Sequence, residues 1–122
     1  MTGRTVLLVD DEAGVRDVMT AFLVRAGHGV LIESAFAQAK ARIVSSPPDA
    51  LVVDVRLGPH NGLQLAWLLR SLRPDARIVV MSGFDDATLR QEAQRVDAPF
   101  LLKPFPGRVL VESLGPAQAT LA

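Results

Sequence analysis

Several apolar stretches of this sequence run into polar residues that could do chemistry together. The residues at the ends of these stretches are Asp10 with Asp11, Asp54, Ser82 and Lys103. Carboxylates crowded at the tip of an apolar segment repel one another and lose hydration. Such a cluster therefore needs either a solvated turn or a bound cation.

The types of these residues indicate phosphate chemistry. Three carboxylates without histidine or cysteine are hard oxygen ligands, which favour Mg²⁺ or Mn²⁺ over zinc. A lysine among carboxylates keeps its proton, because nearby negative charge favours the ionised form. A divalent cation, an ammonium and a hydroxyl can together bind a phosphoryl group. One carboxylate would then be available as a nucleophile to form an aspartyl phosphate.

The segments that must position these residues alternate between strand-like and helix-like patterns. Five apolar runs are continuous, as in strands buried on both faces of a parallel sheet. They span 5–9, 29–33, 50–55, 77–81 and 99–102. The alternation predicts an α/β domain with a five-stranded parallel sheet and helices on both faces. Ligands of such folds bind at the carboxyl ends of the strands, where the polar residues fall.

The helical segments carry their own start and stop signals. They span 12–26, 35–45, 62–72, 87–95 and 106–114. We expect Ser34, Asn61 and either Asp85 or Asp86 to cap three of them. Pro106 suits the first turn of the last helix.

Composition excludes several classes of protein. The 122 residues suffice for one domain, which we assign to 1–114, with 115–122 as a tail or the start of a linker. Thirteen basic and thirteen acidic residues cancel, so we expect no direct binding to nucleic acid or membrane. The sequence contains no cysteine and no apolar run long enough to span a membrane, and its first residues, "MTGRTVLLVDD", lack the apolar stretch and cleavage site expected of a signal peptide. We therefore expect a cytoplasmic protein.

Four motifs together resemble those of a response-regulator receiver domain (CheY-like). They read "LLVDDE", "LVVDVRLGPHNGLQL", "IVVMSGF" and "FLLKPF", and the similarity covers roughly residues 4–114. The resemblance implies a doubly wound five-stranded parallel sheet of strand order 2-1-3-4-5, in a flavodoxin-like three-layer sandwich. It also implies a signalling phosphoacceptor rather than an enzyme, one that assists its own phosphorylation and dephosphorylation.

The resemblance assigns a role to each matching residue. Asp54 corresponds to the phosphoacceptor, and Asp10 and Asp11 to the acidic pair. Asp11 and Asp54 would bind Mg²⁺ directly, with the backbone carbonyl of Arg56 as a further ligand. Lys103 corresponds to the lysine that meets the phosphoryl oxygens.

Two further residues correspond to the family's switch. The Ser82 hydroxyl would move to the phosphoryl group, and Phe100 would turn into the vacated space. The readout surface would be formed by 87–95, 99–102 and 106–114. The phosphoryl group would come from a histidine kinase or a histidine phosphotransfer protein, and the output would be a downstream protein partner or effector domain.

The sequence also departs from the family pattern. Gly58, followed by Pro59, stands where the family often has proline, so the turn at 57–61 could differ in shape. Phe84 stands where many members have a smaller or polar residue, and with Arg56 it flanks the path of attacking water. We therefore expect these residues to affect the lifetime of the phosphorylated state.

Two other functions remain as alternatives. A haloacid-dehalogenase-like phosphatase or phosphotransferase shares the residue types, but it needs Asp-x-Asp and a cap domain. A phosphate-independent interaction module is the second alternative. The acids at 10–12 could also simply favour the start of the next helix.

One helix and two histidines complete the predictions. In 62–72, the spacing turns Leu65, Ala66, Leu69 and Leu72 towards the sheet. Trp67 and Leu68 would then be exposed, either as isolated apolar residues or as a contact surface for a partner or a weak homodimer. His28 and His60 lie in Gly/Pro-rich turns, where we expect solvated side chains.

Overall fold

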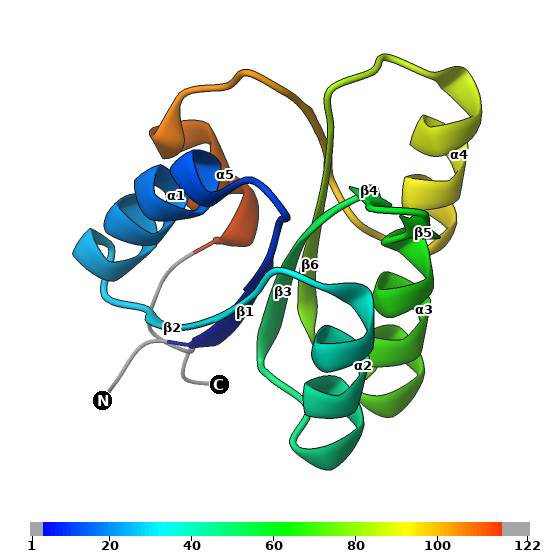
Figure 1. Ribbon diagram of the computed structural model, residues 1–122, viewed down its shortest axis with the longest axis horizontal. Helices are drawn as coiled ribbons and strands as arrows, with labels where there is room; N and C mark the ends of the chain where they lie inside the picture. The colour runs from blue at the N-terminus through cyan, green and yellow to red at the C-terminus, as the bar shows by residue number, and fades with distance from the viewer. Residues whose placement is uncertain (1–3, 116–122) are drawn as a thin grey trace.

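The fold is built on one parallel sheet with helices on both faces (Figure 1). The structure is a computed structural model that describes residues 4–115. Five parallel strands form the sheet in the order β2-β1-β3-β6-β7. Their bounds are β1 Thr5–Val9, β2 Gly29–Glu33, β3 Ala50–Asp54, β6 Arg77–Ser82 and β7 Phe100–Leu102. Counted without the short hairpin β4–β5, this is the predicted order 2-1-3-4-5, which is confirmed.

The helices form two layers. Side chains of α1 (Ala13–Arg25) and α5 (Gly107–Leu114) pack on one face of the sheet. Side chains of α2 (Phe36–Ser45), α3 (Leu63–Leu72) and α4 (Ala87–Arg95) pack on the other. The three-layer sandwich is therefore confirmed. None of the described helices is long and apolar enough to cross a membrane.

Alternation along the strands divides the core between the two layers. In β1, Val6 and Leu8 pack towards α1 and α5, whereas Leu7 and Val9 pack towards α2 and α3. Because the central strands are covered on both sides, every residue of β3 is buried. This double burial explains why these strands appear in the sequence as continuous apolar runs.

A two-stranded antiparallel hairpin follows β3 and was not predicted. Arg56–Leu57 (β4) pairs with His60–Asn61 (β5) across Gly58, whose φ is +58°. Glycine tolerates this left-handed conformation without the steric cost of a side chain. The departure from the family pattern at Gly58 therefore coincides with a turn that favours glycine.

Helix starts agree only in part with the predicted caps. Asp86 caps α4, accepting hydrogen bonds from the backbone N–H groups of Thr88 and Leu89. Asn61 lies one residue before the cap position of α3, yet its side chain accepts from the N–H of Leu63 at 2.9 Å. Ser34 does not cap α2, because the helix begins one residue later, after Ala35. Pro106 lies at the cap position of α5 rather than in its first turn, because the helix begins one residue later than expected, at Gly107.

Three predicted exposures were wrong. Leu72 is 46% exposed, because it is the last residue of α3 and the core cluster reaches only to Leu69. Leu68 is half-buried and packs against the core. His28 is 5% exposed rather than solvated, because the turn after α1 places its side chain in the interior. Burial, with a smaller effect of Arg4, lowers the pKa of His28.

Candidate functional site

The register of the sheet brings the predicted residues to one edge. Val9 is paired with Val53, and Asp54 with Met81, so β1, β3 and β6 end together. Ser82 is in turn paired with Leu102 of β7. The strand ends thus carry Asp10, Asp54, Ser82 and Lys103 towards a common site at the carboxyl ends of the strands.

Lys103 connects the carboxylates of two strands. Its ammonium donates hydrogen bonds to Asp10 Oδ2 and to Asp54 Oδ2, each at 2.7 Å. Asp10 is fully buried, and the Asp54 side chain is only 9% exposed. Charge-assisted hydrogen bonds of this kind are stronger where water is excluded. The lysine therefore offsets much of the cost of burying two acids side by side.

The protonation of Asp54 and Lys103 follows from their surroundings. Burial raises the pKa of Asp54, although the Lys103 ammonium and the Arg56 N–H both oppose this shift. Burial lowers the pKa of Lys103, but the hydrogen bonds and charges of Asp10 and Asp54 outweigh it, and the net pKa is raised. Lys103 is consequently charged at neutral pH.

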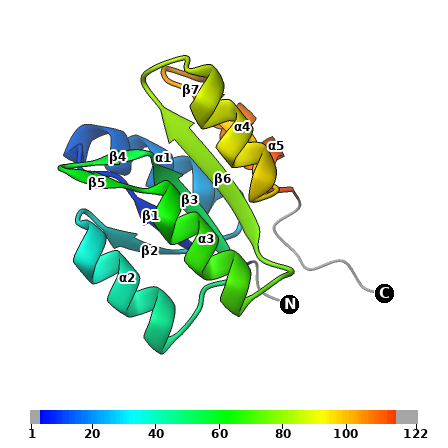
Figure 2. The same ribbon diagram turned by 90° about the vertical axis from the view of Figure 1, so that its right-hand side faces the viewer.

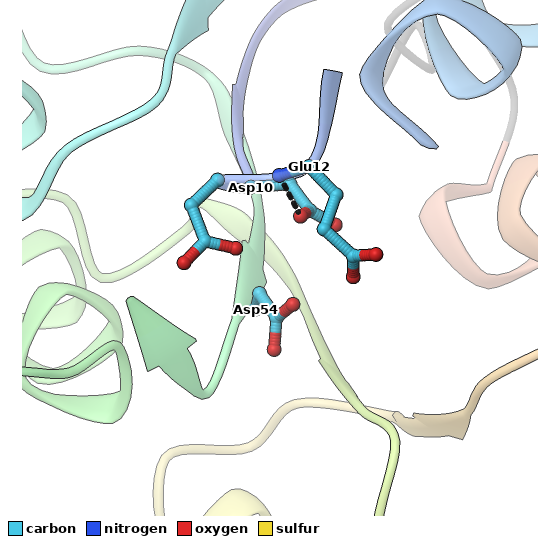
Figure 3. Close-up of side chains that lie close together, drawn as sticks. Asp10, Glu12 and Asp54 are labelled. Carbon is cyan, nitrogen blue, oxygen red and sulfur yellow. Dashed lines mark hydrogen bonds between the residues drawn. The ribbon is translucent and has the colours of Figure 1, made fainter. Parts of the chain in front are cut away.

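Four acids form a cluster whose chemistry fits a hard divalent cation. Asp10, Asp11, Glu12 and Asp54 each offer a carboxylate oxygen, and these oxygens all lie within 4.8 Å of one another. Figure 3 shows Asp10 and Glu12, which follow β1, lying above Asp54 at the end of β3. An all-oxygen donor set of this charge suits Mg²⁺ or Mn²⁺.

Glu12 is a member of this cluster that the sequence analysis did not single out. Its carboxylate lies 3.7 Å from the Lys103 ammonium, and its backbone N–H donates to Asp10 Oδ1. The signal was present as the third acid of "DDE". Reasoning from strand ends missed it, because Glu12 lies at the N-cap position of α1.

The loop after β3 is joined to the acids by backbone hydrogen bonds. The N–H of Arg56 donates to Asp54 Oδ1 at 3.1 Å, and the N–H of Gly58 donates to Asp11 Oδ2 at 3.2 Å. At Gly62, a side chain would overlap the carbonyl oxygen of Asp54. The start of α3 therefore lies directly against the backbone of Asp54. That the Arg56 carbonyl is a metal ligand stays a prediction.

The two predicted switch residues lie on neighbouring strands. Ser82 is 4% exposed, and its hydroxyl accepts from the N–H of Phe84 at 3.0 Å. Phe100 is half-buried at the start of β7, and the Arg90 guanidinium lies 4.7 Å from the centre of its ring. Their roles as a switch stay predictions.

A second cation–π pair lies beside the site. The Arg56 guanidinium lies 4.6 Å from the centre of the Phe84 ring, which is 58% exposed. Arg56 follows Asp54 by two residues, and Phe84 follows Ser82 by two. The two residues that we expected to flank the path of attacking water are thus in contact with each other.

The remaining predicted contact residues lie away from this edge. Trp67 of α3 is 46% exposed, as expected, whereas Leu68 is half-buried. His60 in β5 is exposed and stacks on Phe36, with ring centres 4.7 Å apart.

Comparison with known proteins places this chain in a family. Residues 6–115 match the response regulator receiver domain. The chain is 33% identical over 112 residues to the DNA-binding transcriptional regulator NtrC of Azospirillum brasilense. This match covers 91% of this chain and 23% of the relative. It is also 33% identical over 117 residues to the phosphate regulon transcriptional regulatory protein PhoB of Pseudomonas aeruginosa. That match covers 93% of this chain and 51% of the relative. The chain thus spans about a quarter to a half of these relatives.

Solved structures agree with this assignment. A response regulator protein from Burkholderia pseudomallei, with a phosphorylated aspartic acid, calcium ion and citrate, is 27% identical with a TM-score of 0.82, covering 91% of this chain and 66% of that one. The chemotaxis response regulator CheY4 of Vibrio cholerae is 25% identical with a TM-score of 0.80, covering 93% and 97%. With the strand-end residues gathered at one edge, the sequence match and the shared fold lead to one conclusion: this chain belongs to the response regulator receiver domain family.

Proposed function

We propose that this receiver domain accepts a phosphoryl group on Asp54 from the phosphohistidine of a histidine kinase or histidine phosphotransfer protein in the cytoplasm. The observation that carries the proposal is the Lys103 ammonium, which lies 2.7 Å from Asp10 and from Asp54, two members of the four-acid cluster. An aspartate, a fixed cation and ligands for a second cation are the groups that phosphoryl transfer requires.

In the proposed step, an Asp54 carboxylate oxygen forms a bond to phosphorus while the phosphorus–nitrogen bond to the donor histidine breaks. The histidine leaves with the electron pair of that bond. Lys103 stays charged and pairs with an oxygen of the transferred group. Water later cleaves the acyl phosphate, releasing inorganic phosphate and restoring the carboxylate.

Asp11, Asp54 and the Arg56 carbonyl would hold Mg²⁺, with Asp10 beside them. When bound, the cation would neutralise charge on the phosphoryl oxygens. The acids that follow β1 and Asp54 at the end of β3 would together hold the cation next to the phosphoacceptor oxygen.

Phosphorylation would be read out through Ser82 and Phe100. Within residues 4–115, the Ser82 hydroxyl accepts a hydrogen bond from the N–H of Phe84 and donates none, so its own hydrogen can be donated to a phosphoryl oxygen. A charge-assisted hydrogen bond contributes roughly 1.5–3 kcal/mol, enough to shift a two-state equilibrium about ten- to a hundredfold. The surface formed by α4, β7 and α5 would present the change to a downstream partner or to an effector domain.

Phosphotransfer profiling tests the proposed function. The chain is incubated with each autophosphorylated histidine kinase of its own cell, and transfer of labelled phosphate is followed. We expect rapid transfer from one or a few kinases, abolished in Asp54→Asn and by a chelator of divalent cations. Transfer that Asp54→Asn leaves unchanged would refute Asp54 as the acceptor.

The switch is tested separately. Ser82→Ala should still accept phosphate, but it should lose the phosphorylation-dependent change in binding to the downstream partner. If Ser82→Ala binds that partner like the wild type, Ser82 is no switch. Binding that does not depend on phosphorylation in the wild type would instead favour a phosphate-independent interaction module.

A further inference from the structure

A groove between α2 and α3 lies apart from the phosphoacceptor edge. Figure 2 shows the two helices side by side on one face of the sheet. The groove has a volume of about 370 Å³, and its walls include Phe36 and Lys40 of α2 and Trp67 and Leu68 of α3. None of these four residues takes part in the proposed phosphoryl chemistry.

The apolar side chains of the groove differ in how firmly they are held. Phe36 and Leu68 are half-buried and pack against the core, so they form a fixed floor. Trp67, the only tryptophan of the chain, is 46% exposed at the rim. A large aromatic side chain at the rim of an apolar groove is a common anchor in protein interfaces.

The charged residues in the segments that form and adjoin the groove are all basic. Residues 34–48 and 55–73 contain no aspartate or glutamate, although the whole chain is neutral. Two of the arginines in these segments are already paired, Arg42 with Glu33 and Arg73 with Asp49. Lys40 is exposed and has no ion pair among residues 4–115. The groove therefore offers an apolar surface next to an uncommitted positive charge.

We propose that this groove binds a segment of another protein in which an apolar side chain lies next to an aspartate or glutamate. The apolar side chain packs between Phe36, Leu68 and Trp67. The carboxylate pairs with Lys40 at the rim.

Other occupants fit the groove less well. A second copy joined by a two-fold axis presents the same acid-free face, so its lysine opposes lysine. Nucleic acid requires several phosphate contacts, whereas the groove has one uncommitted cation. A segment that follows α5 in the same polypeptide starts from the opposite face of the sheet. The charge and shape together favour a separate protein.

The inference does not rest on phosphate chemistry, because none of the groove residues forms an ion pair or side-chain hydrogen bond with the acids of the phosphoacceptor site. Asp54→Asn, which removes the proposed phosphoacceptor, should therefore leave binding at the groove unchanged. This separates a failure of the groove from a failure of the proposed function.

The test is selection of a phage-displayed library of random 12-residue peptides on the 122-residue chain. Enriched peptides without tryptophan are synthesised, and their binding is followed by the fluorescence of Trp67. We expect them to combine apolar residues with aspartate or glutamate and to shift amide resonances of α2 and α3. Lys40→Glu should weaken binding about tenfold or more, because it turns an attraction into a repulsion. Trp67→Ala, followed by calorimetry, should weaken it by a similar factor.

Arg95→Glu is the matched control, since Arg95 is exposed on α4 and lies outside the groove. It should bind the peptides like the wild type. Because Lys40 is exposed, Lys40→Glu keeps the test valid even if Trp67→Ala does not fold. Four results would each overturn the proposal: no enriched peptide, enrichment of basic or uncharged peptides, equal binding by Lys40→Glu, or self-association through this face. Binding to anionic vesicles through Lys40, without peptide binding, would show a membrane site instead.

Discussion

At the scale of the residue, Lys103 decides the electrostatics of the site. The Lys103 side chain is 14% exposed, and its ammonium neutralises part of the charge of two buried carboxylates at the ends of different strands. It also competes with any metal ion for those carboxylates, because both cations are attracted to the same oxygens. The balance between them can be measured without any phosphate donor.

Replacing Lys103 by methionine should tighten Mg²⁺ binding. The change removes a positive charge that lies 2.7 Å from Asp10 Oδ2 and from Asp54 Oδ2. By Coulomb's law this corresponds to roughly a tenfold lower dissociation constant for Mg²⁺. Calorimetric titration of Mg²⁺ into the folded variant measures this. Lys40→Met, remote from the site, should bind Mg²⁺ like the wild type. Weaker binding by Lys103→Met would mean that Lys103 organises the acids rather than competing for them.

The Arg56–Phe84 pair should prolong the phosphorylated state. Their cation–π contact, worth roughly 0.5–1 kcal/mol at an exposed site, would hold two bulky side chains where water must approach the proposed acyl phosphate. We therefore predict that Phe84→Ala shortens the lifetime of the acyl phosphate about two- to fivefold, measured as loss of label after the donor is removed. Val44→Ala, which removes another exposed apolar side chain, is the control. An unchanged lifetime in Phe84→Ala would remove any role for the pair in shielding.

At the scale of the element, close contact between α3 and β3 holds Asp54 in place. A Cβ at Gly62 would overlap the Asp54 carbonyl oxygen and come within 2.9 Å of Val53. Gly62→Ala should therefore lower the free energy of unfolding by about 1–3 kcal/mol and slow phosphorylation of Asp54. Urea denaturation and phosphate uptake measure the two effects.

Gly14 provides the matched control for Gly62. It lies in the first turn of α1, and nothing lies within 4 Å of its added Cβ. Gly14→Ala should increase the free energy of unfolding by roughly 0.5–1 kcal/mol, since alanine loses less conformational freedom in a helix. If both variants changed stability alike, the close contact at Gly62 would not be the cause.

Asp49 joins elements at the opposite edge of the sheet and should make stability depend on pH. Its carboxylate accepts from the N–H of Thr5 and from Arg73, each at 2.8 Å. These contacts, the Thr5 N–H foremost, lower the pKa of Asp49 from 3.8. A lowered pKa in the folded state means that this stabilisation is present above pH 3.8 and is lost as the pH falls through the folded pKa.

Asp49→Asn should thus lower the free energy of unfolding by roughly 0.5–1 kcal/mol at pH 7. The effect is small for a charged hydrogen bond because the Asp49 side chain is 41% exposed. Urea denaturation of both proteins should show the difference narrowing below pH 3.8. A difference that stays constant with pH would contradict an ionic contribution from Asp49.

The sequence predicted those elements whose pattern of apolar residues follows directly from burial. β3 was found within one residue because a strand covered on both faces is apolar throughout. The hairpin β4–β5 was missed because two-residue strands have no periodicity of their own. The exposure of Leu72 could not be predicted, because helical spacing gives a face but not how far the sheet covers it.

The candidate site was easier to predict than its surroundings. Asp10, Asp54 and Lys103 came from strand ends, and parallel strands that end together must bring such residues to one edge. His28 was assigned to solvent from its glycine neighbours, yet the turn after α1 buries it. Contacts such as Arg56 with Phe84 depend on side chains from different loops, which no local pattern encodes.

At the scale of the whole molecule, the phosphoacceptor site and the proposed binding groove lie in different places. The acids and Lys103 lie at the carboxyl edge of the sheet, while the groove with Lys40 and Trp67 lies between α2 and α3. The relatives extend well beyond the length of this chain. We propose that the chain works as the receiving part of a signalling system whose output belongs to a downstream partner or effector domain.

The most direct test of the central claim is the mass of the intact chain after incubation with acetyl phosphate and Mg²⁺. We predict the gain of one phosphoryl group, located on Asp54 by mass spectrometry of proteolytic fragments. The gain should be absent in Asp54→Asn and without Mg²⁺. Equal uptake of phosphate by Asp54→Asn, or no uptake by the wild type with Mg²⁺ present, would contradict the account.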